Sequence, residues 1–144
     1  MRLWHQSLIP YLDNKRLLGQ HRECCALRGN GWGKKHSTVD YVFKHDYRDL
    51  YYYHRKVMNE MYARDYMPDE NWLIMRYRGK HAAAFANPNL IYEPGIRSDI
   101  IYPEHDDAYL RECLLNLKSK GAELVNGKSV EQMLIELDLK PIVE

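Results

Sequence analysis

The stretch Gly19–His36, GQHRECCALRGNGWGKKH, runs from the last turns of a predicted helix into a loop rich in glycine. Proline is common in the first turn of a helix, so we expect this helix to begin at Pro10. Gly29, Gly31 and Gly33 end the helix, because glycine is a poor helix former. The positions with helical spacing in this segment are Leu17, Leu18, His21, Cys24, Cys25 and Arg28.

A second helix is predicted over Tyr47–Tyr66, YRDLYYYHRKVMNEMYARDY. Its apolar residues form adjacent stripes at helical spacing. Three successive tyrosines cannot share one helix face, so at least one of them belongs to the core. Pro68 ends the helix. The segment 77–99 is predicted to be a loop with room for one short helical turn, since it contains Gly79, Pro88, Pro94 and Gly95.

Two helices are predicted near the carboxyl end. Asp106 or Asp107 can cap the first of them, whose pattern AYLRECLLNLKSKG ends in lysines and Gly121. Ser129 and Gln132 have the spacing of a capping box at the start of a shorter helix. The sequence shows no strand pattern. We therefore predict an all-α fold of three main helices with long loops and a short extra C-terminal helix.

Length and composition favour one domain. A chain of 144 residues can bury a core by itself, so we expect a single compact domain over residues 1–144. Apolar residues make up 45% of the chain and charged residues 28%. No window holds the roughly 18 apolar residues that a membrane span requires. The amino-terminal sequence also lacks the apolar core of a signal peptide, so we expect a cytoplasmic protein that does not engage a membrane.

The cysteines argue against a disulfide framework. Cys24, Cys25 and Cys113 are odd in number, and two of them are adjacent. Adjacent cysteines do not have the CxxC spacing of a zinc site. We expect reduced thiols, with Cys24 and Cys25 acting as small buried side chains.

Charge is distributed unevenly along the chain. Residues 1–60 contain eleven lysines and arginines against six acidic residues, whereas residues 61–144 contain ten against fourteen. The net charge of the whole chain is only +1. A basic half on a nearly neutral protein indicates a localised anionic partner, with nucleic acid the first candidate.

Glu23 is the single acidic residue in the stretch quoted above, where it lies among four lysines and arginines and two histidines. Gly19 one turn earlier is small and leaves the carboxylate open. Three interpretations remain: a solvated surface residue beside Arg22, an ion pair, or a catalytic acid. His21 suits a core position better than a metal site, because His21 and Glu23 lie on different faces of the helix.

The segment LLGQHRECCALRGNGWGKKH resembles the first catalytic helix of the pyrimidine-dimer DNA glycosylases related to phage endonuclease V, which carries an Arg-Glu pair at this distance from the amino terminus. Arg22 and Glu23 match that pair. Two later segments, VDYVFKHDYRDLYYYHRKVMNEMYARDY and IYPEHDDAYLRECLLNLKSKG, resemble the second helix of the family and the approach to its third. The likeness keeps its order over roughly residues 1–120, and residues 121–144 form a divergent C-terminal extension.

The resemblance implies a catalytic mechanism. In this family the amino-terminal α-amine attacks C1′ of the damaged nucleotide, and the imine that forms allows the strand to be cut. Arg2 is bulky and should keep the initiator methionine in place, so the nucleophile would be the α-amine of Met1. An α-amine has an ordinary pKa of about 7.7 to 8 and is partly neutral at physiological pH. Glu23 would carry protons and stabilise the positive charge that develops at C1′.

The resemblance also implies damaged double-stranded DNA as the partner, with no metal or cofactor, and we expect a monomer. Basic residues of the glycine loop suit phosphate contacts around a distorted site. Trp32 suits either a wedge between bases or an anchor that fixes the loop to the core. The expected DNA-binding residues are Arg2, Arg22, Arg28, Trp32, Lys34, Lys35 and His36.

Two rival functions come from other classes. The same scaffold could serve as a non-catalytic module that binds nucleic acid or protein. A metal-assisted hydrolase could use some of the seven histidines. The identity of the lesion, whether a pyrimidine dimer or an abasic site, does not follow from the sequence.

Overall fold

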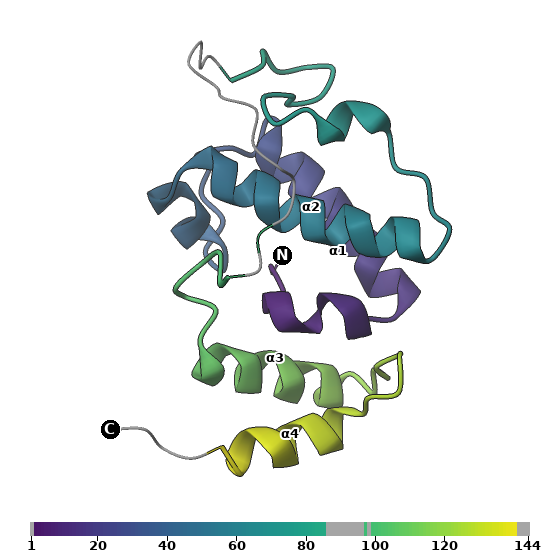
Figure 1. Ribbon diagram of the computed structural model, residues 1–144. Helices are drawn as coiled ribbons and strands as arrows, with labels where there is room; N and C mark the ends of the chain where they lie inside the picture. The colour runs from purple at the N-terminus through teal and green to yellow at the C-terminus, as the bar shows by residue number, and fades with distance from the viewer. Residues whose placement is uncertain (1, 86–96, 98, 141–144) are drawn as a thin grey trace.

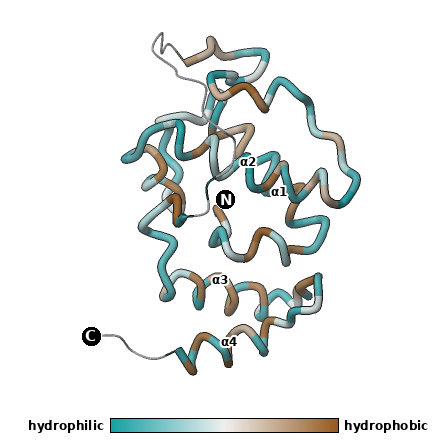
Figure 2. Tube along the Cα trace, viewed as in Figure 1, coloured by the Kyte–Doolittle hydropathy of each residue, from teal (hydrophilic) through white to brown (hydrophobic). Residues whose placement is uncertain are grey.

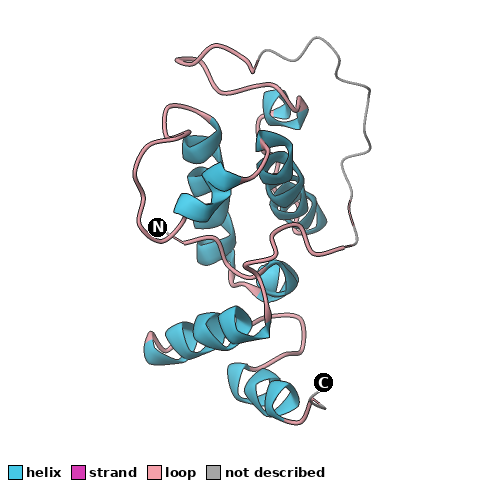
Figure 3. Ribbon diagram, turned by 90° about the vertical axis from the view of Figure 1, so that its left-hand side faces the viewer, coloured by secondary structure: helices cyan, strands magenta, loops and turns pink. Residues whose placement is uncertain are grey.

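Two long helices, α1 (Asn14–Arg28) and α2 (Tyr47–Ala63), pack against each other and form the centre of the molecule (Figures 1 and 3). Each contributes a stripe of buried side chains, such as Leu17 and Leu27 from α1 and Tyr53 and Val57 from α2. Because the apolar positions recur at helical spacing, one face of each helix is withdrawn from water by the other. The computed structural model describes residues 2–85, 97 and 99–140.

The described residues are helical and contain no strand, which confirms the predicted all-α class. Three short 3₁₀ helices accompany the α-helices: η1 (Gln6–Tyr11), η2 (Asp40–Lys44) and η3 (Glu70–Leu73). Near the carboxyl end lie α3 (Asp107–Ser119) and α4 (Val130–Asp138). None of these helices has the length and apolar character that crossing a membrane requires.

The amino-terminal segment lies between the α1–α2 pair and α3 (Figure 1). Leu3 and Leu8 are fully buried and belong to the same apolar cluster as Leu114 of α3. The hydroxyl of Tyr109, in α3, donates a hydrogen bond to the carbonyl oxygen of Leu3. Residues 2–12 therefore form a central layer of the core, which fixes the start of the chain.

The segment after residue 121 packs onto α3. Val130 of α4 is buried in the common apolar cluster, and Met133 and Leu137 pack against it. Figure 2 shows apolar positions along both α3 and α4. The capping predictions for these helices are confirmed, because the Asp106 side chain accepts from the Tyr109 N–H and that of Ser129 accepts from the Gln132 N–H.

The predicted start of the first helix was wrong. Pro10 lies in η1, and the chain is extended at Leu12 before α1 begins. The cap of α1 is Asp13, whose Oδ1 accepts from the Arg16 N–H at 3.1 Å. A side-chain acceptor at this position stabilises the otherwise unpaired first N–H groups of a helix.

The second helix is shorter than predicted. It ends at Ala63, because Asp65 adopts a left-handed backbone conformation with φ of 66° before Pro68 is reached.

The loop after α1 contains glycine because its backbone lies close to the backbone of the last turns of α1. A Cβ atom on Gly31 would lie 2.7 Å from the Ala26 carbonyl oxygen, so only glycine fits there. The described part of segment 77–99 contains no helix, and residues 86–96 and 98 of that prediction lie outside the described residues.

Substitution of the α1 cap tests the corrected boundary. Asp13→Ala should lower the free energy of unfolding by about 1 kcal/mol, because the Arg16 N–H loses its acceptor. Asp13→Asn keeps a side-chain oxygen at the cap and should retain most of the stability. Urea denaturation of both variants gives the comparison. Equal losses in the two variants would show that Asp13 acts through its charge and not as a cap.

Candidate active site

The Glu23 side chain is half-buried in α1 and faces the amino-terminal segment. Its Oε2 accepts the backbone N–H of Arg2 at 3.3 Å and the Nε2 amide of Gln20 at 3.1 Å. No lysine or arginine within residues 2–85, 97 and 99–140 forms an ion pair with Glu23. Glu23 is thus a partly exposed carboxylate that has no ion-pair partner among the described residues and is held by two N–H groups beside the start of the chain.

Burial raises the pKa of Glu23 above its ordinary value. The hydrogen bonds from Arg2 and Gln20 and the nearby charge of Arg22 act in the opposite direction, since each favours the charged form. Desolvation is the larger effect. A carboxyl group with a raised pKa exchanges protons more readily near neutral pH than an exposed glutamate does.

Gln20 was missed by the sequence analysis. It is buried, with Oε1 accepting from the Trp4 N–H at 2.7 Å and from the Tyr53 hydroxyl at 2.8 Å. Its Nε2 donates to the Arg2 carbonyl oxygen at 3.0 Å as well as to Glu23. The available signal was its spacing, three residues after the buried Leu17 and four before Cys24, which places a polar side chain in the buried stripe of α1.

Arg2 lies at the edge of a pocket of about 220 Å³. Its guanidinium carbon is 5.7 Å from the centre of the Trp4 ring and 5.8 Å from that of Tyr109. Arg2 forms an ion pair with Glu112, in which its Nη2 lies 3.7 Å from the Oε1 of Glu112. The pocket is lined by Arg2, Thr38, Tyr41, Glu104, Tyr109 and Glu112.

Arg28 does not match its predicted role in DNA binding. Its side chain is 1% exposed, and its guanidinium donates to four backbone carbonyl oxygens of the segment 72–77, at Trp72, Ile74, Met75 and Tyr77. Burial lowers the pKa of Arg28 to about 10, so the group stays charged at neutral pH. A guanidinium enclosed in this way has no surface to offer a phosphate, and we correct the prediction to a structural role.

The glycine loop presents its residues in different ways. Trp32 makes edge-on ring contacts with Phe43 at 5.1 Å and Phe85 at 5.5 Å, which favours the anchor over the wedge. Lys34 and Lys35 are exposed. The half-buried His36 donates its backbone N–H to Asp40 at 2.6 Å. Arg22 is exposed on α1. Of the predicted DNA contacts, therefore, Arg22, Lys34 and Lys35 present exposed cations.

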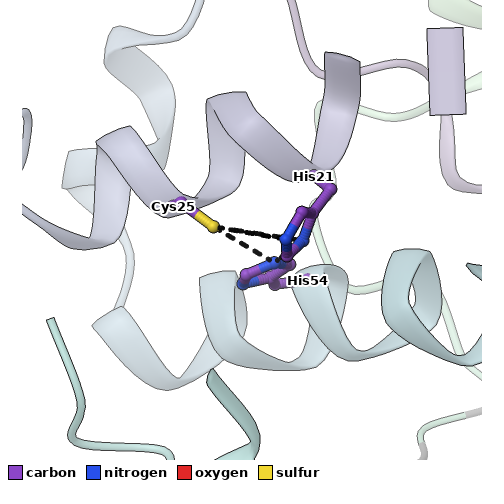
Figure 4. Close-up of side chains that lie close together, drawn as sticks. All are labelled: His21, Cys25 and His54. Atoms are coloured by element: carbon purple, nitrogen blue, oxygen red, sulfur yellow. Dashed lines mark hydrogen bonds between the residues drawn. The ribbon is translucent and has the colours of Figure 1, made fainter. Parts of the chain in front are cut away.

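His21, Cys25 and His54 form a compact cluster between α1 and α2 (Figure 4). The Nδ1 of His21 lies 2.8 Å from the Nε2 of His54, and the Cys25 sulfur is 3.7 to 3.9 Å from the nearest ring nitrogens. Cys24 is fully buried, as predicted, but Cys25 is only half-buried and contacts both histidines. The sequence pattern alone did not predict that His54 would lie beside His21 and Cys25.

Arg28 determines which ring nitrogens of this cluster carry protons. Its Nη1 lies 2.9 Å from the Nδ1 of His54, and because a guanidinium only donates, that nitrogen must accept. A neutral His54 then carries its proton on Nε2 and donates it to His21. Burial lowers the pKa of both histidines, which keeps them neutral. Burial also raises the pKa of Cys25 to about 12 and disfavours the thiolate.

These proton positions make the cluster a poor metal site despite its spacing. A metal ion at the Nε2 of His54 would require the proton to move to Nδ1, directly against the Arg28 guanidinium. Histidines that bind metal ions normally donate their second N–H to an acceptor. The Arg28 charge also repels a cation. We therefore interpret His21, Cys25 and His54 as a buried hydrogen-bonded cluster.

Residues 1–74 match the family described as pyrimidine dimer DNA glycosylase. The matched part contains η1, α1, η2 and α2, and with them Glu23, Gln20 and the glycine loop. This is a class of DNA repair enzymes that act on damaged DNA. The chain belongs to the pyrimidine dimer DNA glycosylase family, as the sequence resemblance predicted. Comparisons with curated proteins and with solved structures found no match.

The role of Arg28 is tested by a pair of lysine substitutions. Arg28→Lys should lower the free energy of unfolding by at least about 2 kcal/mol, because an ammonium cannot supply the forked donors to the carbonyl groups of segment 72–77. Arg22→Lys, on the exposed side of the same helix, should change it by less than about 0.5 kcal/mol. Chemical denaturation of the two variants measures the difference. A stable Arg28→Lys protein would contradict the structural role.

The raised pKa of Glu23 predicts a pH-dependent stability difference. The pKa of Glu23 in the folded state lies above its ordinary value of 4.5. The folded state therefore loses stability relative to the unfolded state as the pH rises from the unfolded-state pKa to the folded-state pKa. Glu23→Gln removes this loss. The variant should gain stability over the wild type between pH 4 and pH 7, as measured by thermal unfolding in matched buffers. A gain that shrinks as the pH rises would contradict the direction of the shift.

Proposed function

We propose that the protein is a DNA glycosylase and abasic-site lyase that acts on damaged double-stranded DNA through the α-amine of Met1, assisted by Glu23. The observation that supports this most directly is the hydrogen bond from the Arg2 N–H to the Glu23 carboxylate, at 3.3 Å. Met1 itself lies outside the described residues. Only its Cα and carbonyl carbon separate the α-amine from the Arg2 amide nitrogen, so covalent geometry keeps the two nitrogens within about 4 Å.

The proposed reaction uses this proximity. The neutral amine attacks C1′, the bond from C1′ to the base nitrogen breaks, and the base leaves with a proton. The C1′–O4′ bond then opens as O4′ takes a proton from solvent, and the iminium that forms at C1′ carries a positive charge that the Glu23 carboxylate offsets. Loss of a proton from C2′ then breaks the C3′–O bond and cuts the strand. An α-amine is suited to the attack because its ordinary pKa of about 7.7 to 8 leaves a neutral fraction at physiological pH.

Glu23 is arranged for proton transfer as well as for charge stabilisation. Both of its hydrogen bonds end on Oε2, and among the described residues no hydrogen bond reaches Oε1. Oε1 is therefore the oxygen that would receive a proton from C2′ or deliver one. The raised pKa of the carboxyl group favours this exchange at neutral pH.

Exposed cations of α1 and of the loop that follows it provide the proposed DNA contacts. Arg22 is beside Glu23 in the chain, and Lys34 and Lys35 lie in the loop that follows α1. The loop returns toward the amino-terminal segment, since Thr38 and Arg2 line the same pocket. Contacts of this kind position DNA through its phosphates, and binding should weaken steeply with added salt.

Borohydride trapping tests the function. The untagged protein is mixed with duplexes that contain either an abasic site or a thymine dimer, reduced, and analysed by mass spectrometry. We expect a covalent adduct on the Met1 amine with both duplexes, and the same adduct in EDTA. An extension placed before Met1 should abolish it. Strand cutting that stops in EDTA and gives no adduct would favour the metal-assisted hydrolase instead.

Glu23→Gln separates the enzyme from a binding module. The variant should lower the rate of strand cutting at least a hundredfold, because the amide neither carries the proton nor balances the iminium, while its affinity for DNA stays within about threefold. Glu136→Gln, on the exposed side of α4, is the matched control and should cut at the normal rate. Tight DNA binding by the wild type with no adduct on either duplex would identify a non-catalytic module.

A further inference from the structure

We infer that Gln20 is the positioning residue of the active site, because its buried amide holds the backbone of Arg2 and the carboxylate of Glu23 in one fixed relation. The inference rests on the proposed function and extends it to a residue outside the reacting groups. Gln20 is 1% exposed, and the structure uses both ends of its amide. A buried polar side chain with all its partners satisfied is a rigid element of a core.

The orientation of the Gln20 amide is fixed by its partners. The Trp4 N–H only donates, so the side-chain atom 2.7 Å from it must be the oxygen. The Arg2 carbonyl only accepts, so the atom 3.0 Å from it must be the NH₂ group. The two requirements agree, and no rotation of the amide by 180° satisfies either. The NH₂ group therefore offers one hydrogen to Arg2 and the other to Glu23.

One planar group thus fixes the Arg2 backbone relative to the Glu23 carboxylate. The Arg2 carbonyl and the Glu23 Oε2 lie 3.0 and 3.1 Å from the same nitrogen atom. The amide hydrogens diverge at a fixed angle, so the two acceptors cannot move independently without losing a bond. Since the α-amine is attached to Arg2 through one residue, Gln20 limits where that amine can lie relative to Glu23.

Tyr53 of α2 supports the arrangement from behind. Its hydroxyl oxygen lies 2.6 Å from the Trp4 carbonyl oxygen and 2.8 Å from the Gln20 Oε1, and the side chain is fully buried. Because the hydroxyl has one hydrogen and both neighbours are acceptors, it donates to one of them at a time or shares the hydrogen between them. Segment 2–4, α1 and α2 therefore meet at the Gln20 amide.

The chemistry of this position requires an amide. Glutamate would keep the acceptor for Trp4 but would place a second carboxylate about 3 Å from Glu23, which disfavours the charged form of both. Methionine would keep the volume but leave the Arg2 carbonyl and one Glu23 bond unmade. Each substitution also removes a hydrogen bond that holds the amino-terminal segment. Because each changes the surroundings of the Glu23 carboxylate, each should change the pH profile of the reaction, which a loss of stability alone would not do.

The test compares the pH profile of single-turnover strand cutting in Gln20→Met, Gln20→Glu and Val57→Ala. Val57 is buried in α2 and serves as the control for lost core packing. We expect Gln20→Met to lower the rate at least tenfold and to move the acid limb of the profile to higher pH, because the Glu23 carboxylate loses a donor. Gln20→Glu should move it further. Tyr53→Phe, a milder change, should lower the rate two- to fivefold. DNA affinity should stay within about threefold in all of them.

Profiles of the Gln20 variants that coincide with that of Val57→Ala, once corrected for the folded fraction, would overturn the inference. Failure of the proposed function is a different result, in which the wild type itself forms no borohydride adduct. In that case the pKa of the Glu23 carboxyl group, followed by NMR of the folded proteins, still decides the matter. An unchanged Glu23 pKa in Gln20→Met would show that Gln20 does not organise this carboxylate.

Discussion

The buried amide of Gln20 is the contact on which the rest of the arrangement depends. The first residues of a domain are often poorly ordered unless contacts with the core hold them. Here Leu3 and Trp4 are buried, and the backbone from Arg2 to Trp4 is hydrogen-bonded to Gln20, Tyr53, Tyr109 and Glu23. The burial of Leu3 and Trp4 stabilises the segment in the core, and the hydrogen bonds fix its position relative to α1, α2 and α3. Together they bring residues 2–4 to Glu23, the only carboxylate of the stretch Gly19–His36.

A second buried polar group, Arg28, likewise holds a backbone segment in place by hydrogen bonds, in this case the irregular segment 72–77. The segment 72–77 has no sheet to pair with among the described residues, and four of its carbonyl groups accept from one guanidinium. In return, Arg78 donates to the carbonyl oxygens of Arg28 and Gly29 at the end of α1, at 2.9 Å each. Buried carbonyl groups and helix ends both need partners, and here two arginines provide them.

Much of the fold followed from local sequence signals, whereas the site followed only in part. The caps Asp106 and Ser129 were predicted because a capping residue acts within its own helix turn. The predicted helix start at Pro10 was wrong because proline also suits a 3₁₀ helix, and Asp13 is the residue that caps α1. Arg28 and Gln20 needed tertiary information, because a polar residue in an apolar stripe does not reveal whether distant carbonyl groups or amides will meet it. Glu23 was predicted as a site residue from its unusual surroundings and from the family resemblance, and it stays a candidate.

The exchange of donors between α1 and segment 72–78 has a thermodynamic consequence. Arg28 cannot leave its site without releasing the four carbonyl groups of that segment, and Arg78 cannot leave without releasing the end of α1. If either segment opens while the other stays in place, polar groups lose their hydrogen-bond partners. Arg78 and Arg28 are 50 residues apart in the sequence. The carboxyl end of α1 and the segment 72–78 therefore behave as one cooperative unit of local unfolding, so the rigidity of α1 depends partly on that segment.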